Sequence, residues 1–390
     1  MSYGPMEEVD VESVAELEAA AFAFPASEAG DWFARAGHEN MRVFREGDSV
    51  AAALMLVPMG QFFGGRSVKT MGVAGVAVAL DRRQQKLGQR LMKASLVEAH
   101  ERGFELSTLY PATRTLYRSV GYDLAGKLVE ITLHTSRLEL CERFEPLDVR
   151  PMTAELEPLS EALYAERAAA LHGHLDRGPY IWGRVRRPRK GTCRGFAFFD
   201  DESLVAYTYF TQESQASGHD HDAVITDFVA KDARGYAALF EFYRGQRSVL
   251  DSIRLKGNAS APYLSLLREP RHDEEAMIDW MIRIVDLPAA VLARGYSPRT
   301  SATVTVEVRD DVIAENTGVW TISLENGTAS VKKGGKPRVS LDIRALAPIY
   351  AGYYTASEAR LLGSVAGEAD ACEALDAIFQ SPMPGMSEMF

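Results

Sequence analysis

The sequence predicts an α/β (α+β) chain of three parts, in which the second part repeats the element order of the first. Three observations lead to this prediction. Helical and strand periods of hydrophobic residues alternate along the chain from residue 11 to residue 379. Two series of helix, three strands, helix and strand follow one another, and Pro146 and Pro151 break the pattern between them. We therefore expect domains over residues 1–148, 149–285 and 286–390.

The first part combines an N-terminal helix and a following short helix or loop, at 24–33, with a strand meander and a long central helix. Its expected elements, in chain order, cover residues 11–22, 24–33, 41–45, 49–57, 69–78, 84–102, 106–110, 113–120 and 127–133. The central helix, expected over 84–102, carries apolar residues such as Leu87 and Leu91 on one side. Gly103 stands where a glycine commonly ends a helix.

The second part starts over with a helix and lacks the basic, glycine-bearing turn of the first. Its expected elements cover residues 156–171, 193–199, 204–212, 223–230, 235–250 and 252–256. We interpret it as a degenerate internal duplication. The third part is expected to begin with helices over 278–288 and 289–294. Strands at 303–308, 318–324, 328–332 and 338–342 follow, with Asn326-Gly327 as a hairpin turn, and then helices at 343–352, 355–362 and 369–379.

Composition narrows the class of protein. The chain is 46% hydrophobic and 25% charged, as a globular protein is, and its net charge of −11 disfavours nucleic acid and anionic membranes as partners. A small cationic molecule suits this charge better. Residues 1–35 hold eight acids and one base, which a solvated helix face explains equally well. We find no leader and no long apolar run, and therefore expect a cytoplasmic protein.

Metal binding is not expected. Cys141, Cys193 and Cys372 lie far apart without the spacing of metal ligands. His219-Asp-His-Asp222 could ligate a metal, but glycine and serine flank it, and we interpret it as a solvated loop.

The segment from the third strand into the central helix has the parts of a site for an acyl-coenzyme A. Its pyrophosphate needs backbone N–H groups at a helix N-terminus, and its pantetheine amides need a strand with which to pair. Basic residues at that helix N-terminus oppose the helix dipole, which indicates that an anion is expected there. The expected cofactor contacts are Val76, Ala77, Val78, Arg82, Arg83, Lys86, Leu87, Gly88 and Gln89.

This layout resembles the GNAT superfamily of N-acetyltransferases, in which Gln/Arg-x-x-Gly-x-Gly/Ala follows the strand. Arg83 and Gly88 occupy the first and last motif positions, and Lys86 stands where the first glycine is usual. The resemblance implies acetyl-CoA as co-substrate. A lysine at that position must point away from the pyrophosphate or embrace it with its charge.

A tyrosine one helix downstream gives the second element of the resemblance. In GNAT enzymes such a tyrosine, close to the coenzyme sulfur, often acts as general acid, and Tyr117 lies in the matching segment with Gly121-Tyr122 after it. Tyr110 and Tyr122 are rivals, for which core packing is the alternative role. Position in the sequence favours Tyr117.

Over nearly its whole length the chain resembles one branch, the enhanced intracellular survival (Eis) aminoglycoside N-acetyltransferases. The matching segments are Val76-Ala-Val78 with Arg82-Arg83, Leu116-Tyr117-Arg-Ser-Val-Gly121-Tyr122, Asp279-Trp280, Asp286-Leu-Pro288-Ala-Ala, Ala293-Arg-Gly-Tyr296 and a terminal phenylalanine. The resemblance implies two fused GNAT-like folds of which only the first is active, a C-terminal domain like sterol carrier protein, and a hexamer. It also implies a general base, the terminal carboxylate of Phe390.

The acceptor pocket is expected among Phe24, Trp32 and Glu388, which offer apolar walls and negative charge. We expect direct acetyl transfer to a primary amine of a polycationic small molecule. Two alternatives stay open at this point. One is acetylation of protein lysine, and the other is a non-catalytic protein that binds a lipid or another ligand through its C-terminal domain.

Overall fold

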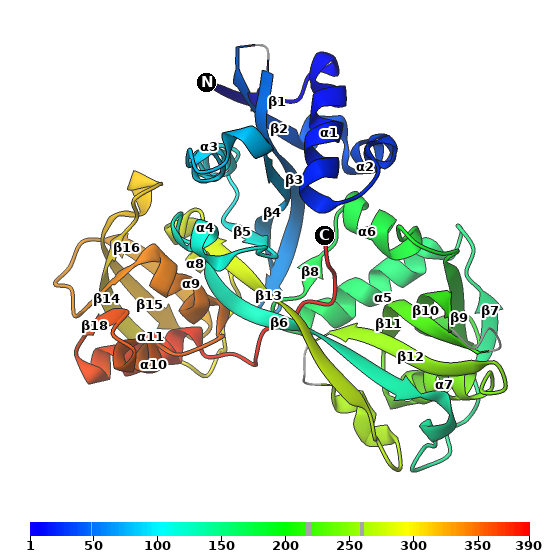
Figure 1. Cartoon of the computed structure of the whole chain (residues 1–390). Coiled ribbons are helices and arrows are strands. Elements are labelled where there is room, and N and C mark those ends of the chain that lie inside the picture. Colours follow the sequence, from blue (N-terminus) through cyan, green and yellow to red (C-terminus); the bar gives the residue numbers. More distant parts are fainter. Residues whose placement is uncertain (48, 216–219, 258–260) are drawn as a thin grey trace. The chain divides into compact units, whose positions relative to one another are not determined.

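The structure, a computed structural model, describes residues 1–47, 49–215, 220–257 and 261–390 (Figure 1). The chain forms two compact units. The first holds residues 1–126, 279–384 and Phe390, and the second holds residues 127–278 and 385–389. None of the described helices combines the length and the apolar character needed to cross a membrane.

The first unit is built around two long antiparallel strands, β3 and β4. Its N-terminal part consists of β1 (Ser2–Pro5), α1 (Val11–Phe22), α2 (Ala29–Ala36), β2 (Met41–Glu46), β3 (Ser49–Phe63), β4 (Arg66–Val78), α3 (Leu87–Glu101), β5 (Leu106–Leu109) and α4 (Arg114–Arg118). The strands follow the order β1-β2-β3-β4-β5-β13, where β13 is Asp273–Ile284, and only β4 and β5 run parallel. This is the helix, meander, helix and strand order that the sequence predicts.

Strand β4 leaves part of one edge open. It pairs with β3 along almost its whole length, but with β5 only from Thr70 to Val73. No described strand pairs with the 74–78 segment on that side. The register against β3 shifts at the same place, where Ala53 and Met55 face Ala77 and Ala74, so β4 bulges there.

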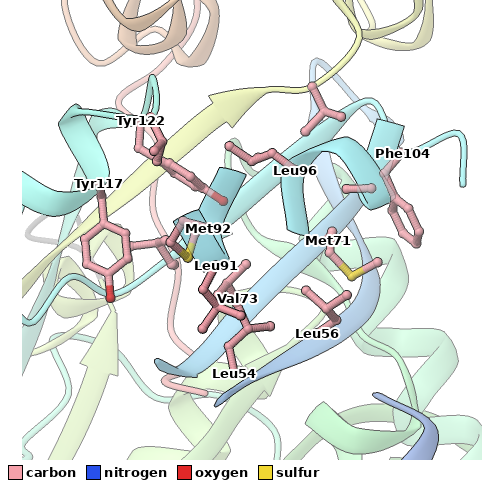
Figure 2. Close-up of a cluster of buried hydrophobic side chains, with 14 of the residues drawn as sticks. Leu54, Leu56, Met71, Val73, Leu91, Met92, Leu96, Phe104, Tyr117 and Tyr122 are labelled. Atoms are coloured by element: carbon pink, nitrogen blue, oxygen red, sulfur yellow. The ribbon is translucent and has the colours of Figure 1, made fainter. Parts of the chain in front are cut away.

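Helices cover both faces of these strands. Helices α1 and α3 both pack on β3 and β4 and lie on opposite sides of them (Figure 1). The core beneath α3 brings Met71 and Val73 of β4 against α3 and the aromatic pair Tyr117 and Tyr122 (Figure 2). Since side chains alternate along a strand, Gly72 and Ala74 face the α1 side.

The predicted central helix begins later than expected. Helix α3 starts at Leu87, and residues 84–86 belong to the preceding loop. Gln84 and Lys86 have positive φ angles of 68° and 57°, which a helix does not allow. The predicted end is confirmed, because Gly103 follows the helix with a φ of 67°.

The prediction of a helix over 278–288 is wrong. Residues up to Ile284 form strand β13 (Asp273–Ile284), whose segment 281–284 pairs with β5. These residues are buried on both faces of the sheet, and such a continuous apolar run fits a buried strand as well as a helix. The helix begins only at Leu287, where the Asp286 carboxylate accepts a hydrogen bond from the Ala289 N–H at 2.9 Å.

The C-terminal part of the first unit has its own sheet, ordered β16-β15-β14-β17-β18. Its elements are α8 (Leu287–Ala293), β14 (Ala302–Arg309), β15 (Gly318–Glu325), β16 (Thr328–Lys333), β17 (Val339–Asp342), α9 (Ile343–Ala351), α10 (Ala356–Leu361), β18 (Val365–Gly367) and α11 (Ala369–Phe379). Asn326 and Gly327 have φ angles of 50° and 76° between β15 and β16, as the predicted hairpin turn requires.

The second unit repeats the architecture of the first. Its elements are β6 (Asp123–His134) from Lys127 onward, β7 (Asp148–Pro151), α5 (Glu157–Ala169), β8 (Leu175–Asp176), α6 (Pro179–Arg186), β9 (Arg194–Asp200), β10 (Ser203–Ser214), β11 (His221–Ala230), α7 (Ala233–Arg244), β12 (Leu250–Gly257) and the first residues of β13. Strand β11 is antiparallel to β10, with a bulge opposite Tyr209, and parallel to β12. These relations are those of β4 to β3 and β5.

Candidate active site

The open edge of β4 can receive an extended chain. Its Val76 and Val78 are half-buried and Ala77 between them is buried, so the strand is anchored while its free edge stays accessible. The outward backbone N–H and C=O groups of this edge can pair with the amides of a pantetheine arm, as they would with a neighbouring strand.

The loop after β4 leads directly into the N-terminus of α3. Lys86 is the N-cap residue of this helix and makes no capping hydrogen bond with its side chain. The first N–H groups of α3 are therefore free to bind an anion, which the helix dipole also attracts. Lys86 takes the left-handed conformation that a glycine would adopt most easily, so the chain keeps the shape of the motif without the glycine.

The basic residues of this loop differ in their partners. Arg82 is ion-paired with Glu46 and also contacts Asp81. Arg83 and Lys86 are exposed, and the described residues offer neither of them an ion pair. These two are therefore the cations of the loop that an anionic ligand can bind without breaking an existing pair.

Three further predicted contact residues shape the start of α3. Leu87 is a buried core residue. Gly88 lies beside Leu116 and Val78, where a Cβ atom would make ordinary van der Waals contacts at 3.4 Å and 3.7 Å. The Gln89 side-chain amide donates to the Ser119 hydroxyl at 3.0 Å and so ties α3 to the end of α4.

Tyr117 of α4 lies at the edge of the core cluster with 5% of its surface exposed. Burial raises the pKa of its hydroxyl to about 12. Its ring packs edge to face on Tyr122, with 6.2 Å between ring centroids, and its hydroxyl points away from that ring (Figure 2). The Tyr122 hydroxyl instead bonds Ser107 at 2.7 Å inside the core. The structure therefore gives Tyr122 the packing role.

A buried arginine supports the turn after Tyr117. Arg283 Nε donates to the carbonyl oxygen of Val120 at 3.0 Å, and its Nη2 donates to both carboxylate oxygens of Asp310, at 2.7 Å and 2.6 Å. Gly121 has a φ of 91°, and a Cβ atom there would lie only 2.6 Å from Arg283 Nε. This turn therefore needs a glycine at position 121 for two reasons: the positive φ angle and the lack of space for a Cβ atom.

The terminal residue lies on the α1 side of β4. The Phe390 ring packs edge to face on Tyr110, with 5.8 Å between ring centroids. A Cβ atom on Gly72 would lie 3.0 Å from the Phe390 ring, so the ring rests directly on the strand. The last residue is therefore packed within the first unit, and Tyr110 contributes to its packing.

Trp32 lies over the bulge of β4, and Phe24 is half-buried in the segment after α1. A Cβ atom on Gly75 would lie 2.5 Å from Cη2 of Trp32 and 3.3 Å from Oε1 of Glu18. The sequence analysis places Glu18 among the acids of a solvated helix face, whereas the structure buries it. Its spacing could have indicated this, since Glu18 follows the buried Val14 by four residues and lies on the same face of α1.

Glu388 lies in the second unit, with 7% of its surface exposed. Its Oε1 accepts hydrogen bonds from Arg177 Nε at 2.6 Å and from the Tyr164 hydroxyl at 2.8 Å. Burial alone would raise the pKa of this carboxyl, but the positive charge of Arg177 holds the pKa below its usual value. Arg177 also binds Asp227 with two hydrogen bonds. These contacts anchor the tail, and the role of Glu388 in an acceptor pocket stays a prediction.

Among the described residues no group of three His, Cys, Asp or Glu side chains is placed to hold a metal ion. His219 lies outside the described residues.

Comparisons with known proteins match each part of the chain. Two models described as acetyltransferase (GNAT) domains match residues 2–125 and 173–284, and a sterol carrier protein domain model matches residues 287–387. An uncharacterized N-acetyltransferase of Streptomyces griseus is 25% identical over 345 residues, which cover 82% of this chain and 81% of that protein. One of Streptomyces coelicolor is 25% identical over 315 residues, or 74% and 73% of the two chains.

Solved structures share the whole architecture. A GCN5-related N-acetyltransferase from Anabaena variabilis superposes with a TM-score of 0.95 at 29% identity, and 100% of each chain is covered. Eis1 from Mycobacterium abscessus superposes with a TM-score of 0.82 at 20% identity, again over 100% of each chain, which shows a common fold. The chain is therefore an N-acetyltransferase that contains two GNAT domains and a C-terminal domain like sterol carrier protein.

Proposed function

We propose that the chain transfers the acetyl group of acetyl-CoA directly to a primary amine of a polycationic small molecule, such as an aminoglycoside. The observation that carries the co-substrate is the open β4 edge at 74–78, which leads into the uncapped N-terminus of α3 with Arg83 and Lys86 free of ion pairs. The net charge of −11 supports a cationic acceptor. The resemblance of the sequence motifs to the Eis aminoglycoside N-acetyltransferases supports this class of acceptor.

Tyr117 and Phe390 divide the proton transfers in this proposal. The amine nitrogen attacks the thioester carbonyl carbon, the C–S bond breaks, and the sulfur leaves with a proton from the Tyr117 hydroxyl. A phenol of pKa about 12 is a weaker acid than a thiol of reference pKa about 8.5. The proton transfer must therefore be concerted with cleavage of the C–S bond.

The Phe390 carboxylate takes the proton from the amine. An α-carboxylate of reference pKa about 3.3–3.7 is a weak base for an ammonium ion, so water relays the proton or burial strengthens the base. Its negative charge also attracts the cationic acceptor. Phe24 and Trp32 supply apolar walls for that acceptor. Following the Eis resemblance, we further propose a cytoplasmic hexamer with domain boundaries near residues 148 and 285.

The reaction is tested by release of free thiol from acetyl-CoA in the presence of tobramycin or kanamycin. Turnover with these amines that exceeds turnover with lysyl peptides supports the proposal. Faster turnover with the peptides would favour acetylation of protein lysine. No thiol release with a broad panel of amines would contradict the proposal.

The role of the terminus has a separate test. Two glycines added after Phe390 move the terminal carboxylate two residues further along the chain, and kcat should fall about tenfold or more while the Kd of CoA stays nearly unchanged. A C-terminal amide at Phe390, made by semisynthesis, removes only the charge and serves as the matched control. An unchanged kcat in both proteins would remove the carboxylate from the mechanism.

A further inference from the structure

Glu18 is a buried carboxyl group without a partner. Glu18 has 0% of its surface exposed, and neither of its Oε atoms has a hydrogen-bond partner among the described residues. Such a burial is unfavourable, because the group loses its water and gains no protein donor in return. Burial also raises the pKa of this carboxyl well above its usual value. A group of this kind needs a functional explanation.

The surroundings of Glu18 combine an acid and an aromatic ring. Its Oε1 and Cη2 of Trp32 approach the same backbone position, since a Cβ atom on Gly75 would lie 3.3 Å from the first and 2.5 Å from the second. Gly75 has a φ of 56° at the bulge of β4, and the Trp32 ring and the Glu18 carboxyl occupy the place that a side chain there would take. It directly precedes Val76, the first residue of the open strand edge.

This place lies on the acceptor side of the strand. Gly72, three residues before Gly75, contacts the ring of Phe390 on the same face, while Val73 points into the core beneath α3. The Glu18 carboxyl, the Trp32 indole and the Phe390 ring thus share one face of β4 within the first unit.

We propose that Glu18 and Trp32 form an ammonium-binding subsite, which holds an amino group of the acceptor other than the one that is acetylated. An ammonium ion supplies the donors that the protein does not give to Glu18, and charge-assisted hydrogen bonds of this kind are strong. The indole adds a ring face that attracts cations. The inference rests on the proposed function and restricts the acceptor to molecules with two or more amino groups.

The subsite is tested by steady-state kinetics with tobramycin and acetyl-CoA on the full chain. Glu18→Gln should raise the KM for tobramycin about 10- to 100-fold, while kcat and the KM for acetyl-CoA stay within about twofold. Glu16→Gln is the matched control, because it makes the same substitution at an exposed position of the same helix and should change neither constant.

A second variant separates binding from folding. Glu18→Leu should raise Tm, since it removes an unpaired buried polar group. It should raise the KM for tobramycin as much as Glu18→Gln does. An unchanged KM for tobramycin in both variants would overturn the subsite. A large fall in kcat with an unchanged KM would also overturn it, because Glu18 would then act in proton transfer. A wild-type chain that acetylates no amine would instead contradict the proposed function itself.

Discussion

Lys86 keeps a left-handed backbone conformation at a position where glycine is usual in GNAT motifs. It has φ 57° and ψ 22° as the N-cap of α3, and a side chain in that region costs about 1 kcal/mol. Its exposed charge at the end of the helix that would bind the pyrophosphate offers a reason for the lysine. Lys86 thus lowers the stability of the fold slightly and places a positive charge at the proposed pyrophosphate site.

Lys86→Gly should therefore raise the free energy of unfolding by up to about 1 kcal/mol and weaken CoA binding about fivefold. Lys86→Ala is the control, because it removes the charge and keeps a Cβ atom in the left-handed region. Urea unfolding and calorimetric titration with CoA check both variants. Equal stability of the glycine and alanine variants would show that the backbone strain is absent.

Tyr117→Phe should lower kcat by about 10²–10⁴-fold if this residue is the general acid.

The pH dependence of kcat gives a second prediction for Tyr117. Burial raises the pKa of Tyr117 to about 12, so its hydroxyl keeps its proton at pH 10, where an ordinary tyrosine is half ionised. The kcat of the wild type should consequently show no loss between pH 8 and 10 from this group. A decline centred near pH 10 that disappears in Tyr117→Phe would contradict this assignment.

At this scale the sequence could indicate residue types but not their partners. The place of Tyr117 in a motif predicts its role, whereas Trp32 is indicated only as an aromatic residue near the first helix. Nothing in the linear order could pair Glu388 with Arg177, which lies 211 positions earlier in the chain. Glu18 looked like its exposed neighbours in composition, although its spacing from Val14 places it on the buried face.

At the scale of elements, strand β4 and helix α3 form the proposed co-substrate site. Hydrophobic periodicity predicted both, and it missed the true start of α3 because left-handed residues at 84 and 86 have no signature in a window of hydrophobicity. It also predicted a helix for β13, because residues buried on both faces show no period of two. The open strand edge depends on where β5 ends, which is a matter of pairing and not of composition.

The pairing of Arg283 with Asp310 joins β13 to the turn after β14. Arg283 is completely buried and supports the Val120 carbonyl in the turn that follows Tyr117. Asp310 is its carboxylate partner and also accepts a hydrogen bond from Asn316 at 2.9 Å. The C-terminal domain thus contributes to holding in place the turn that follows Tyr117, the proposed general acid.

Asp310→Ala should lower the free energy of unfolding by about 3–5 kcal/mol, because it leaves the Arg283 charge buried and unpaired. Asp311→Ala, at the exposed neighbouring position, should change it by less than about 0.5 kcal/mol. Denaturant unfolding measures both. A similar, small effect of the two substitutions would show that the buried pair does not stabilise the fold.

At the scale of the whole molecule, the two GNAT domains differ in the features that would bind CoA. Helix α3 has the uncapped Lys86 at its N-terminus, whereas α7 is capped by Asp232, whose carboxylate accepts from the Gly235 N–H at 3.0 Å. A carboxylate in this place occupies the donors and repels a pyrophosphate. Asp227 follows the bulge of β11 directly and is bound by Arg177 and the Tyr207 hydroxyl, whereas the bulge of β4 includes Gly75.

Calorimetric titration should therefore give one CoA bound per chain, and this site should weaken in Lys86→Ala. Asp232→Ala should lower stability by about 1 kcal/mol through loss of the cap and leave the stoichiometry at one. Two equivalent sites per chain would contradict the difference drawn between the two domains.

The duplication could be predicted from the repeated element order, whereas the degeneracy of the second copy stays a prediction from its missing basic turn. The contacts of Arg177 with Asp227 and Glu388 could not be predicted, because they join segments far apart in the sequence.

A crystal structure of the full chain with bound CoA tests the central claim most directly. The account predicts the pantetheine arm along the edge of Val76 to Val78, the pyrophosphate at the N-terminus of α3, and the sulfur facing the Tyr117 hydroxyl. CoA bound away from the β4 edge, or a sulfur that faces neither Tyr117 nor Phe390, would contradict it.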